Sequence, residues 1–480
     1  MRAGKLCAVL VAGLLAVGLF TSARAGQEFE VTSPDGKVRV TVEMQEGRPF
    51  YSLEWDGRAL IRASRLGVET KQGTFDGRCV VEDTSRRSFD GTWKPTWGQF
   101  SAVRNNYNQL SVNLATSSEP TARMTIVFRA YNDGIGFRYR WPADQAGDGL
   151  QIGGERTEFR LAGNYDAWWV SRQWGIHETD APRPAGRLEK LNTPFTLRAA
   201  EDCYLSIHEA ALENYAPMRL RRVGEEGEPS FRAVLNSPVT TRVPHRSPWR
   251  TVQVASRSGG LIESSLLRNL NRPCMLRDTS WIKPGQSMWD WRVRGATVDG
   301  FTYGLDDESI QRFIDFAAEN GVEYMMIDAG WYGSERENNP LTWEDSVNVP
   351  DLIDYADERD VGMWLYVNSG PIKRFTPERV LSTYKEWGAV GIKHGFLSDP
   401  TQRGIEFCHK VLRECAEREI MYDCHEATKP TGFSRTYPNY MTREFVHSLV
   451  DGRIPASSPT YVCTFPFLNG LAGPVNRTPG

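Results

Sequence analysis

Histidine and cysteine, the usual ligands of transition metals, are scarce and unfavourably spaced in this sequence of 480 residues. It has seven histidines without an HxxxH spacing and eight cysteines without a CxxC pair. Seven cysteines, an odd number, would remain after residue 25, so we expect neither a disulfide framework nor a structural zinc site. No glycine-rich phosphate loop follows a predicted strand, which argues against a nucleotide-binding fold.

Long apolar runs are also missing, apart from one at the N-terminus. Arg2 and Lys5 precede the apolar segment 6–20, and Ala23-Arg24-Ala25 offers a small-residue cleavage site. This layout is typical of a secretory signal peptide over residues 1–25, and the run is short for a transmembrane span. We therefore expect a bacterial protein that is periplasmic or secreted and has no membrane attachment after cleavage.

Positive charge is not in excess either. The sequence has 57 basic and 60 acidic side chains, and loss of Arg2, Lys5 and Arg24 with the leader would change the net charge from −3 to −6. A chain of this charge is not expected to bind nucleic acid or an anionic membrane. We expect it to act as a monomer.

Alternation of apolar and polar residues with a period of two dominates the first half of the chain. Apolar residues occupy every second position from Val38 to Met44, and Asn132-Asp133-Gly134 is a hairpin signal between two β-prone runs. Helical periodicity is nearly absent from 27 to 260. These patterns predict an N-terminal antiparallel β-sandwich domain over residues 26–270.

Strands and helices alternate in the second half. The β-prone runs are SMWDWRV, EYMMIDAGW, GMWLYVNS, VGIKHGFL, REIMYDCHE and YMTREFV. Among the helical patterns between them, one ends at Gly321, one starts at Thr376-Pro377 and stops at Gly388, and one spans 402–418. Such alternation predicts a parallel sheet and favours a (β/α)₈ TIM-type barrel over residues 271–480. Fewer than eight units are present, so we expect the barrel to be incomplete at its C-terminus.

Polar residues stand where successive strands of this predicted barrel end, which is where barrels place their chemistry. Carboxylates, a lysine and a histidine beside indole rings suit the hydroxyls and the apolar face of a pyranose. Glycoside hydrolysis needs two carboxyl groups. The residues at the strand ends are Asp290, Asp328, Asn368, Lys393, His394, His425, Glu426 and Glu444. We expect five aromatic residues at the same rim: Trp289, Trp291, Trp331, Tyr332 and Trp364.

Three stretches resemble glycoside hydrolase family 97. They are WIKPGQSMWDW (281–291), HEATKPTGFSRTYPN (425–439) and PFLNGLAGPVNRTPG (466–480). The resemblance implies an exported bacterial α-glucosidase or α-galactosidase that acts on oligosaccharides. In the family the barrel closes and a further β-domain follows, so we expect this chain to be a fragment or the product of a truncated gene.

The resemblance also implies a calcium ion beside the substrate. By position its ligands are Glu178, Glu426 and Glu444. A hard cation takes oxygen ligands, and clustered carboxylates need a cation to offset their repulsion. The family's substrate-contacting positions correspond to Lys393 and His425, and more weakly to Asp290 and Asp328.

The same resemblance bears on the mechanism. Retaining members of the family have an aspartate nucleophile after the fourth strand, where this sequence has Gly395. The inverting members have glycine there and use a water molecule instead. The base of the inverting branch includes the glutamate that corresponds to Glu426, and its second base corresponds to Asn368, which cannot take a proton. We therefore expect inversion.

The general acid of the family corresponds to Val450, which has no proton to donate. Asp451 and Glu444 remain as alternatives, although a residue one step along a strand faces the other way. Two functions stay open. One is an inverting, calcium-assisted α-glycoside hydrolase with Glu426, Glu444 and Asp451 as catalytic residues. The other is a catalytically impaired relative that binds carbohydrate.

Overall fold

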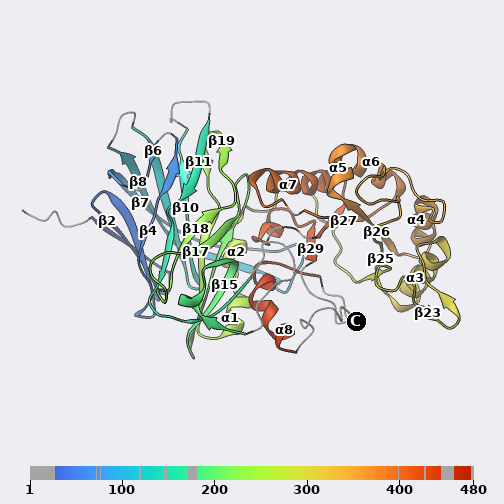
Figure 1. Cartoon of the computed structure of the whole chain (residues 1–480), viewed down its shortest axis with the longest axis horizontal. Coiled ribbons are helices and arrows are strands. Elements are labelled where there is room, and N and C mark those ends of the chain that lie inside the picture. Colours follow the sequence, from blue (N-terminus) through green and yellow to red (C-terminus); the bar gives the residue numbers. More distant parts are fainter. Residues whose placement is uncertain are drawn as a thin grey trace, which may run out of the picture.

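The computed structural model describes residues 27–71, 73–75, 77–117, 121–143, 149–170, 181–397, 399–425, 427, 429–444 and 459–476. A β-rich part from the first half of the chain lies beside an α/β part from the second half (Figure 1). The predicted signal peptide lies outside the described residues. Within the described ranges, no helix is both long enough and apolar enough to cross a membrane.

The β-rich part is antiparallel throughout, as the alternating pattern predicts. Strand β2 alternates between buried and more exposed residues, and Asn132-Asp133 forms the turn between β9 and β10. The larger sheet curls around one apolar core. Its strands are β1 (Glu28–Thr32), β2 (Val38–Gln45), β3 (Arg48–Trp55), β4 (Arg58–Arg65), β7 (Cys79–Trp93), β8 (Val103–Thr116), β9 (Arg123–Tyr131), β10 (Gly134–Trp141), β12 (Glu158–Leu161), β13 (Asp166–Val170), β14 (Arg183–Pro184), β15 (Lys190–Ala200), β16 (Cys203–Ala210), β17 (Met218–Arg222), β18 (Ser230–Leu235), β20 (His245–Arg246) and β21 (Trp249–Ala255).

A smaller antiparallel sheet and two short helices complete this part. The sheet contains β5 (Val68–Thr70), β6 (Gly73–Thr74), β11 (Leu150–Glu155) and β19 (Val239–Thr241). Helices α1 (Ser258–Glu263) and α2 (Leu266–Asn269) follow β21, before the parallel sheet begins. The change of architecture thus falls between β21 and the first parallel strand.

The second half forms a six-stranded parallel sheet, part of the predicted barrel. Its strands lie side by side in chain order, and each corresponds to one predicted β-prone run. They are β22 (Ser287–Trp289), β25 (Tyr324–Ile327), β26 (Gly362–Asn368), β27 (Gly391–Gly395), β28 (Met421–His425) and β29 (Tyr440–Glu444). The hairpin of β23 (Thr297–Val298) and β24 (Phe301–Thr302) projects after β22.

The helices on this sheet begin and end where the cap residues predict. Gly321 and Gly388 terminate α3 and α6 in the left-handed conformation that glycine adopts readily, and Thr376 caps the start of α6. Asn348 caps a helix that the apolar pattern alone did not predict. The helices are α3 (Asp307–Asn320), α4 (Val349–Asp357), α5 (Ser369–Arg374), α6 (Pro377–Trp387), α7 (Gln402–Glu417) and α8 (Pro459–Thr464).

A buried ammonium group locks the loop after β28 into the β-rich part. Lys429, with a side chain 2% exposed, donates from Nζ to Glu209 Oε1 at 2.7 Å, to the Thr193 hydroxyl at 2.6 Å and to the Met218 carbonyl at 2.5 Å. These acceptors lie on three strands, β16, β15 and β17. An ammonium group has three N–H donors, so every one of them has a partner here.

Glu209 belongs to a row of four buried charges that cancel one another. Arg250 donates to Glu209 and to Glu155, both at 2.5 Å. Burial would raise the pKa of Glu209, but Lys429 and Arg250 hold that pKa below its ordinary value. An unpaired charge in such a place costs several kcal/mol, so the row is stable only when it is complete.

A neutral histidine holds the backbone of the same loop. His208 contacts the Pro430 carbonyl through Nε2 at 2.8 Å and the Thr193 hydroxyl through Nδ1 at 3.0 Å. Burial lowers the pKa of His208 to about 3. Because a carbonyl oxygen can only accept, the proton of the neutral ring is on Nε2, and Nδ1 accepts from Thr193.

We expect Lys429→Met to lower the free energy of unfolding by about 3 to 5 kcal/mol, because it leaves Glu209 buried with one partner fewer. Urea unfolding followed by tryptophan fluorescence measures this change. The control is Lys410→Met, since Lys410 forms an ion pair with Glu378 in which both side chains are more than 40% exposed. That variant should lose less than about 1 kcal/mol. Equal losses in the two variants would contradict the burial argument.

Candidate active site

The carboxyl ends of the parallel strands meet at one edge of the sheet. Tyr366 of β26 pairs with Lys393 of β27, and Lys393 pairs with Asp423 of β28. Paired residues of neighbouring strands lie on the same face of the sheet, so these three residues share one face. His425 and Glu444 are paired at the ends of β28 and β29. We call this edge the mouth of the barrel. The structure therefore brings the backbone of the predicted strand-end residues to one place.

Asp328 and Lys393 form a buried ion pair in this mouth. Lys393 Nζ lies 2.8 Å from Asp328 Oδ2, and the two side chains are 4% and 6% exposed. The indole N–H of Trp289 donates to the same oxygen at 2.5 Å, and the ring of Trp289 lies 4.5 Å from the ammonium. Both charges are thus paired and oriented, which is the arrangement that binds sugar hydroxyls with little loss of entropy.

Asp290 lies directly beneath this pair and is fully buried. Its Oδ2 accepts from Arg294 at 2.9 and 2.5 Å, and its Oδ1 accepts from the backbone N–H of Asp328 at 2.9 Å. Burial raises the pKa of Asp290, and Arg294 opposes that shift. In this structure Asp290 orients Asp328, and its predicted contact with substrate stays a prediction.

His425 ends β28, the strand beside the one that carries Lys393. Its ring stacks on Phe396, with centroids 5.4 Å apart, and Phe396 in turn lies 5.3 Å from the guanidinium of Arg336. Phe396 has a φ of 56°, a conformation that is unusual for a residue with a side chain. His425 as a whole is partly buried, and its Nδ1 atom is buried.

Gly395 is covered by Tyr366, a residue that sequence reasoning missed. A Cβ atom at Gly395 would clash with the hydroxyl and the ring of Tyr366. Asn368 caps helix α5, because its Oδ1 accepts from the backbone N–H of Gly370 at 2.9 Å. The space over Gly395 is therefore filled by a tyrosine, and Asn368 has a structural task.

Part of the predicted site lies outside the described residues. This holds for Glu178, Glu426, Val450 and Asp451, and for Glu444 only the backbone is described, as the last residue of β29. Among the described residues, no group of three histidine, cysteine or carboxylate side chains is arranged to hold a metal ion. The predicted calcium ligands and acid therefore stay predictions.

The aromatic residues near the strand ends have different positions. Trp289 contacts the ion pair. Trp291, two residues further along the chain, is 46% exposed. The expectation of a rim position is wrong for Trp331, which is completely buried and packs against Tyr384 and Trp387 of α6. Its indole N–H donates to the Tyr366 carbonyl at 2.9 Å, so it supports the mouth from behind.

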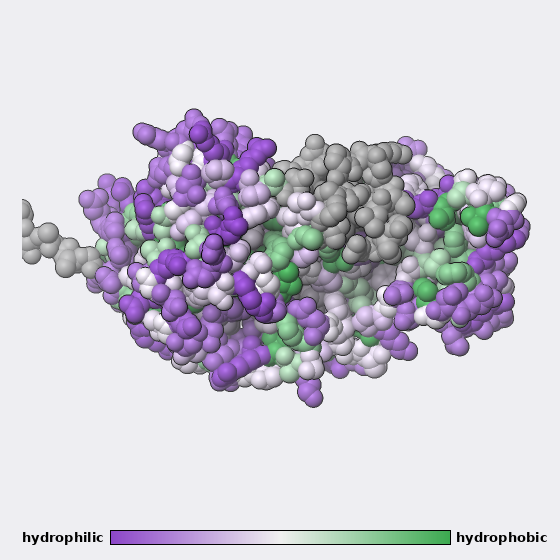
Figure 2. All heavy atoms as spheres, turned by 90° about the horizontal axis from the view of Figure 1, so that it is seen from below, coloured by the Kyte–Doolittle hydropathy of each residue, from purple (hydrophilic) through white to green (hydrophobic). Residues whose placement is uncertain are grey.

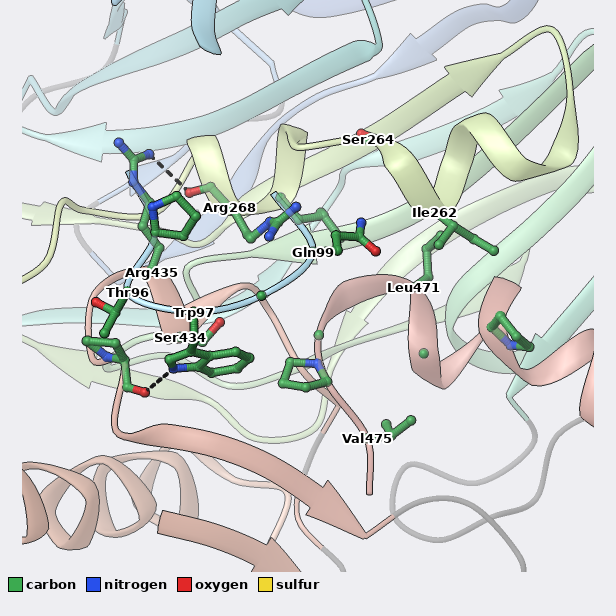
Figure 3. Close-up of a pocket in the computed structure, with 18 of the residues that line it drawn as sticks. Thr96, Trp97, Gln99, Ile262, Ser264, Arg268, Ser434, Arg435, Leu471 and Val475 are labelled. Atoms are coloured by element: carbon green, nitrogen blue, oxygen red, sulfur yellow. Dashed lines mark hydrogen bonds between the residues drawn. The ribbon is translucent and has the colours of Figure 1, made fainter. Parts of the chain in front are cut away.

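A cavity of about 350 Å³ lies away from the mouth, at the junction of the two parts. Figure 3 shows Trp97, Gln99, Arg268 and Arg435 on one side of it and Leu471 and Val475 on the other. The indole N–H of Trp97 donates to the Pro438 carbonyl at 2.7 Å. The mouth residues described above do not line this cavity. Figure 2 shows apolar residues exposed along the hollow between the two parts.

These features, a β-domain beside a parallel-strand barrel with paired charges at its mouth, are those of a glycoside hydrolase. The family model described as Glycosyl-hydrolase 97 N-terminal matches residues 31–273, and the model described as Glycoside hydrolase 97 matches residues 288–446. The chain belongs to glycoside hydrolase family 97 and is an α-glycosidase.

Relatives of known name agree with this assignment. The chain is 26% identical to a retaining alpha-galactosidase of Bacteroides thetaiotaomicron over 97% of its own length and 75% of that protein. It is 25% identical to a probable retaining alpha-galactosidase of Streptomyces bingchenggensis over 98% of its own length and 74% of that protein.

Solved structures share the fold. A family 97 enzyme in complex with acarbose from Pseudoalteromonas sp. strain K8 superimposes with a TM-score of 0.86 at 24% identity, over 94% of this chain and 74% of that one. A beta-arabinopyranosidase superimposes with a TM-score of 0.79 at 21% identity, over 94% of this chain and 76% of that one.

We expect Asp328→Asn to reduce kcat/KM for 4-nitrophenyl α-galactoside or α-glucoside about ten- to hundredfold. The change leaves the buried Lys393 ammonium without its counter-charge, and a hydrogen bond to a charged group contributes roughly 1.5 to 3 kcal/mol. Initial-rate kinetics give kcat and KM separately. Asp345→Asn, on the exposed part of the same loop, is the matched control and should behave as the wild type. Unchanged kinetics in Asp328→Asn would remove Asp328 from the site.

Proposed function

We propose that this α-glycosidase is an exported enzyme that hydrolyses α-galactosidic or α-glucosidic bonds of oligosaccharides with inversion and with the help of calcium. The observation that carries the proposal of inversion is the contact between Gly395 and Tyr366. Glycine itself supplies no nucleophile, and a side chain at position 395 would have to displace the ring of Tyr366. Water must then attack the sugar directly, as in inverting glycosidases.

Each residue of the site has a separate task in this proposal. Asp328 and Lys393 hold sugar hydroxyls, His425 contacts the sugar ring, and Asp290 keeps Asp328 in place. Glu426 follows the last residue of β28 and serves as a base for the attacking water. Asp451 or Glu444 protonates the leaving oxygen. Export is inferred from the signal peptide pattern of residues 1–25.

The kind of sugar is inferred from the relatives. The two named relatives are an alpha-galactosidase and a probable alpha-galactosidase, which supports an α-galactoside as substrate. Family 97 structures of the Pseudoalteromonas enzyme in complex with acarbose and with panose support an oligosaccharide. Both relatives are named as retaining enzymes. The proposal of inversion differs from those names and rests on Gly395 of this chain.

The residue types at the ends of β28 and β29 support a calcium ion in this proposal. The backbone of Glu444, at the end of β29, pairs with that of His425, at the end of β28. Glu426 is the next residue after His425 in the chain. Carboxylate oxygens are the ligands that calcium prefers, and Glu178 would supply a third from the β-rich part. When bound, the ion offsets the repulsion of these carboxylates and lowers the pKa of a neighbouring water.

We expect the first product released from an α-glycoside to be the β-anomer of the sugar. Proton NMR of the anomeric signals in the first minutes of an aryl α-galactoside or α-glucoside hydrolysis tells the two outcomes apart. An α-anomer formed first means retention and overturns this mechanism. A protein that binds these sugars and cleaves none of them favours the carbohydrate-binding alternative.

Chelation should lower the melting temperature of the protein. An ion that binds only the folded state stabilises it by mass action, by about 2.7 kcal/mol at a hundredfold excess over its Kd. Thermal unfolding with EGTA and with added calcium measures the shift. Glu444→Gln should be less sensitive to the chelator, whereas Glu358→Gln, on an exposed turn after α4, should respond as the wild type. Equal melting temperatures with and without EGTA contradict the site.

A further inference from the structure

We propose that Glu335 supplies the second carboxylate of the general base, in place of the residue at position 368. This inference rests on the inverting mechanism proposed above and names a residue that carries it out. Glu335 lies in the loop between β25 and α4. Its Oε2 accepts a hydrogen bond from the Tyr366 hydroxyl at 2.9 Å.

The position of Glu335 follows from what surrounds Tyr366. The Tyr366 hydroxyl lies next to Gly395, and the side-chain amide of Asn368 donates to it at 3.3 Å. The Tyr366 hydroxyl therefore connects the carboxylate of Glu335 to both positions at which sequence reasoning found a catalytic group missing, position 368 by a second hydrogen bond and position 395 by contact. Glu335 itself reaches Tyr366 from the neighbouring strand's loop.

The loop that carries Glu335 is held firmly. The buried hydroxyl of Tyr332 donates to the Glu335 carbonyl at 3.0 Å. Arg374 donates to the carbonyls of Arg336 and Glu337 at 2.8 and 2.7 Å. Arg336 also lies over Phe396, which stacks on His425. The loop therefore spans the mouth from Tyr366 to the predicted sugar contact at His425.

Exposure decides which member of the Tyr366–Glu335 pair reacts. The side chain of Glu335 is 28% exposed, so water reaches it, whereas Tyr366 is 1% exposed. Burial, and then the charge of Glu335, raise the pKa of Tyr366. The phenol therefore stays protonated and donates a hydrogen bond to the carboxylate. A protonated, buried phenol is a poor nucleophile, and an accessible carboxylate is a suitable base.

Bonds and protons balance in this step. The water oxygen forms a bond to the anomeric carbon while one of its protons moves to a carboxylate oxygen of Glu335. The bond from the anomeric carbon to the glycosidic oxygen breaks, and that oxygen takes a proton from the acid on the opposite face, Asp451 or Glu444. Tyr366 is a positioning residue, because it only orients Glu335.

The test is Glu335→Gln with an activated aryl α-galactoside or α-glucoside as substrate. Loss of a general base reduces the rate roughly 10² to 10⁴-fold, and we expect kcat to fall within that range while KM changes little. The acid limb of the kcat–pH profile should disappear. Glu335→Asp keeps a carboxyl group and should recover part of the rate. In Glu335→Ala, added azide should accelerate the reaction and form a β-glycosyl azide.

Two further variants separate catalysis from structure. Glu337→Gln lies on the same loop and is exposed, so it should match the wild type in kcat and melting temperature. Tyr366→Phe should lose about tenfold or less, because only orientation is affected. Unchanged kcat in Glu335→Gln overturns this inference and leaves inversion standing. Two results overturn inversion and this inference together: labelling of Tyr366 by a fluorosugar, and an α-anomer formed first. A wild-type protein without turnover also overturns both.

Discussion

The ammonium group of Lys429 is buried between the two parts of the molecule, and the position of the loop after β28 depends on it. This loop follows the strand end at His425 and includes Glu426, the proposed calcium ligand. Its own main chain is held by His208 and its lysine by Glu209. Strands of the β-rich part therefore hold the described residues of this loop beside the parallel sheet.

The same principle, that a buried charge needs a complete set of partners, shapes the mouth itself. Lys393 and Asp328 neutralise each other, and Asp290 holds the backbone of Asp328 while Arg294 neutralises Asp290. Such a chain of paired charges resists rearrangement because any broken pair leaves an unsatisfied ion. The polar groups of the mouth are therefore held in fixed positions by one another.

Close packing determines the shape of the mouth around Gly395. Gly395 and Tyr366 occupy complementary volumes, so a side chain at position 395 would have to displace the Tyr366 ring. The tyrosine brings its hydroxyl to this place, and Glu335 accepts a hydrogen bond from it. The sequence alone revealed that Gly395 and Asn368 lack a carboxylate, whereas the packing reveals that the Tyr366 hydroxyl lies beside both residues.

The strands and most helices followed from the sequence because their signals are local. Apolar residues with a period of two predicted the sheet of the β-rich part, and Gly321 and Gly388 ended helices where only a left-handed residue fits. Helix α4 was missed although Asn348 signals its start, because its apolar pattern is short. The placement of Asp328 and Lys393 at strand ends was likewise predictable, because strand ends of a parallel sheet converge.

Contacts between distant segments were decided only by the tertiary structure. Lys429 and Glu209 are far apart in the chain, and neither belongs to a pattern that reveals its partner. Trp331 looked like a rim residue, but packing turned it toward α6. By itself the sequence determined the order of the elements and the residue types at the mouth, because these depend on short-range spacing, and three of its stretches resembled the family to which the chain belongs. The tertiary structure decided which charges meet and which side chain fills the space over Gly395, because those outcomes depend on how separate strands and loops pack.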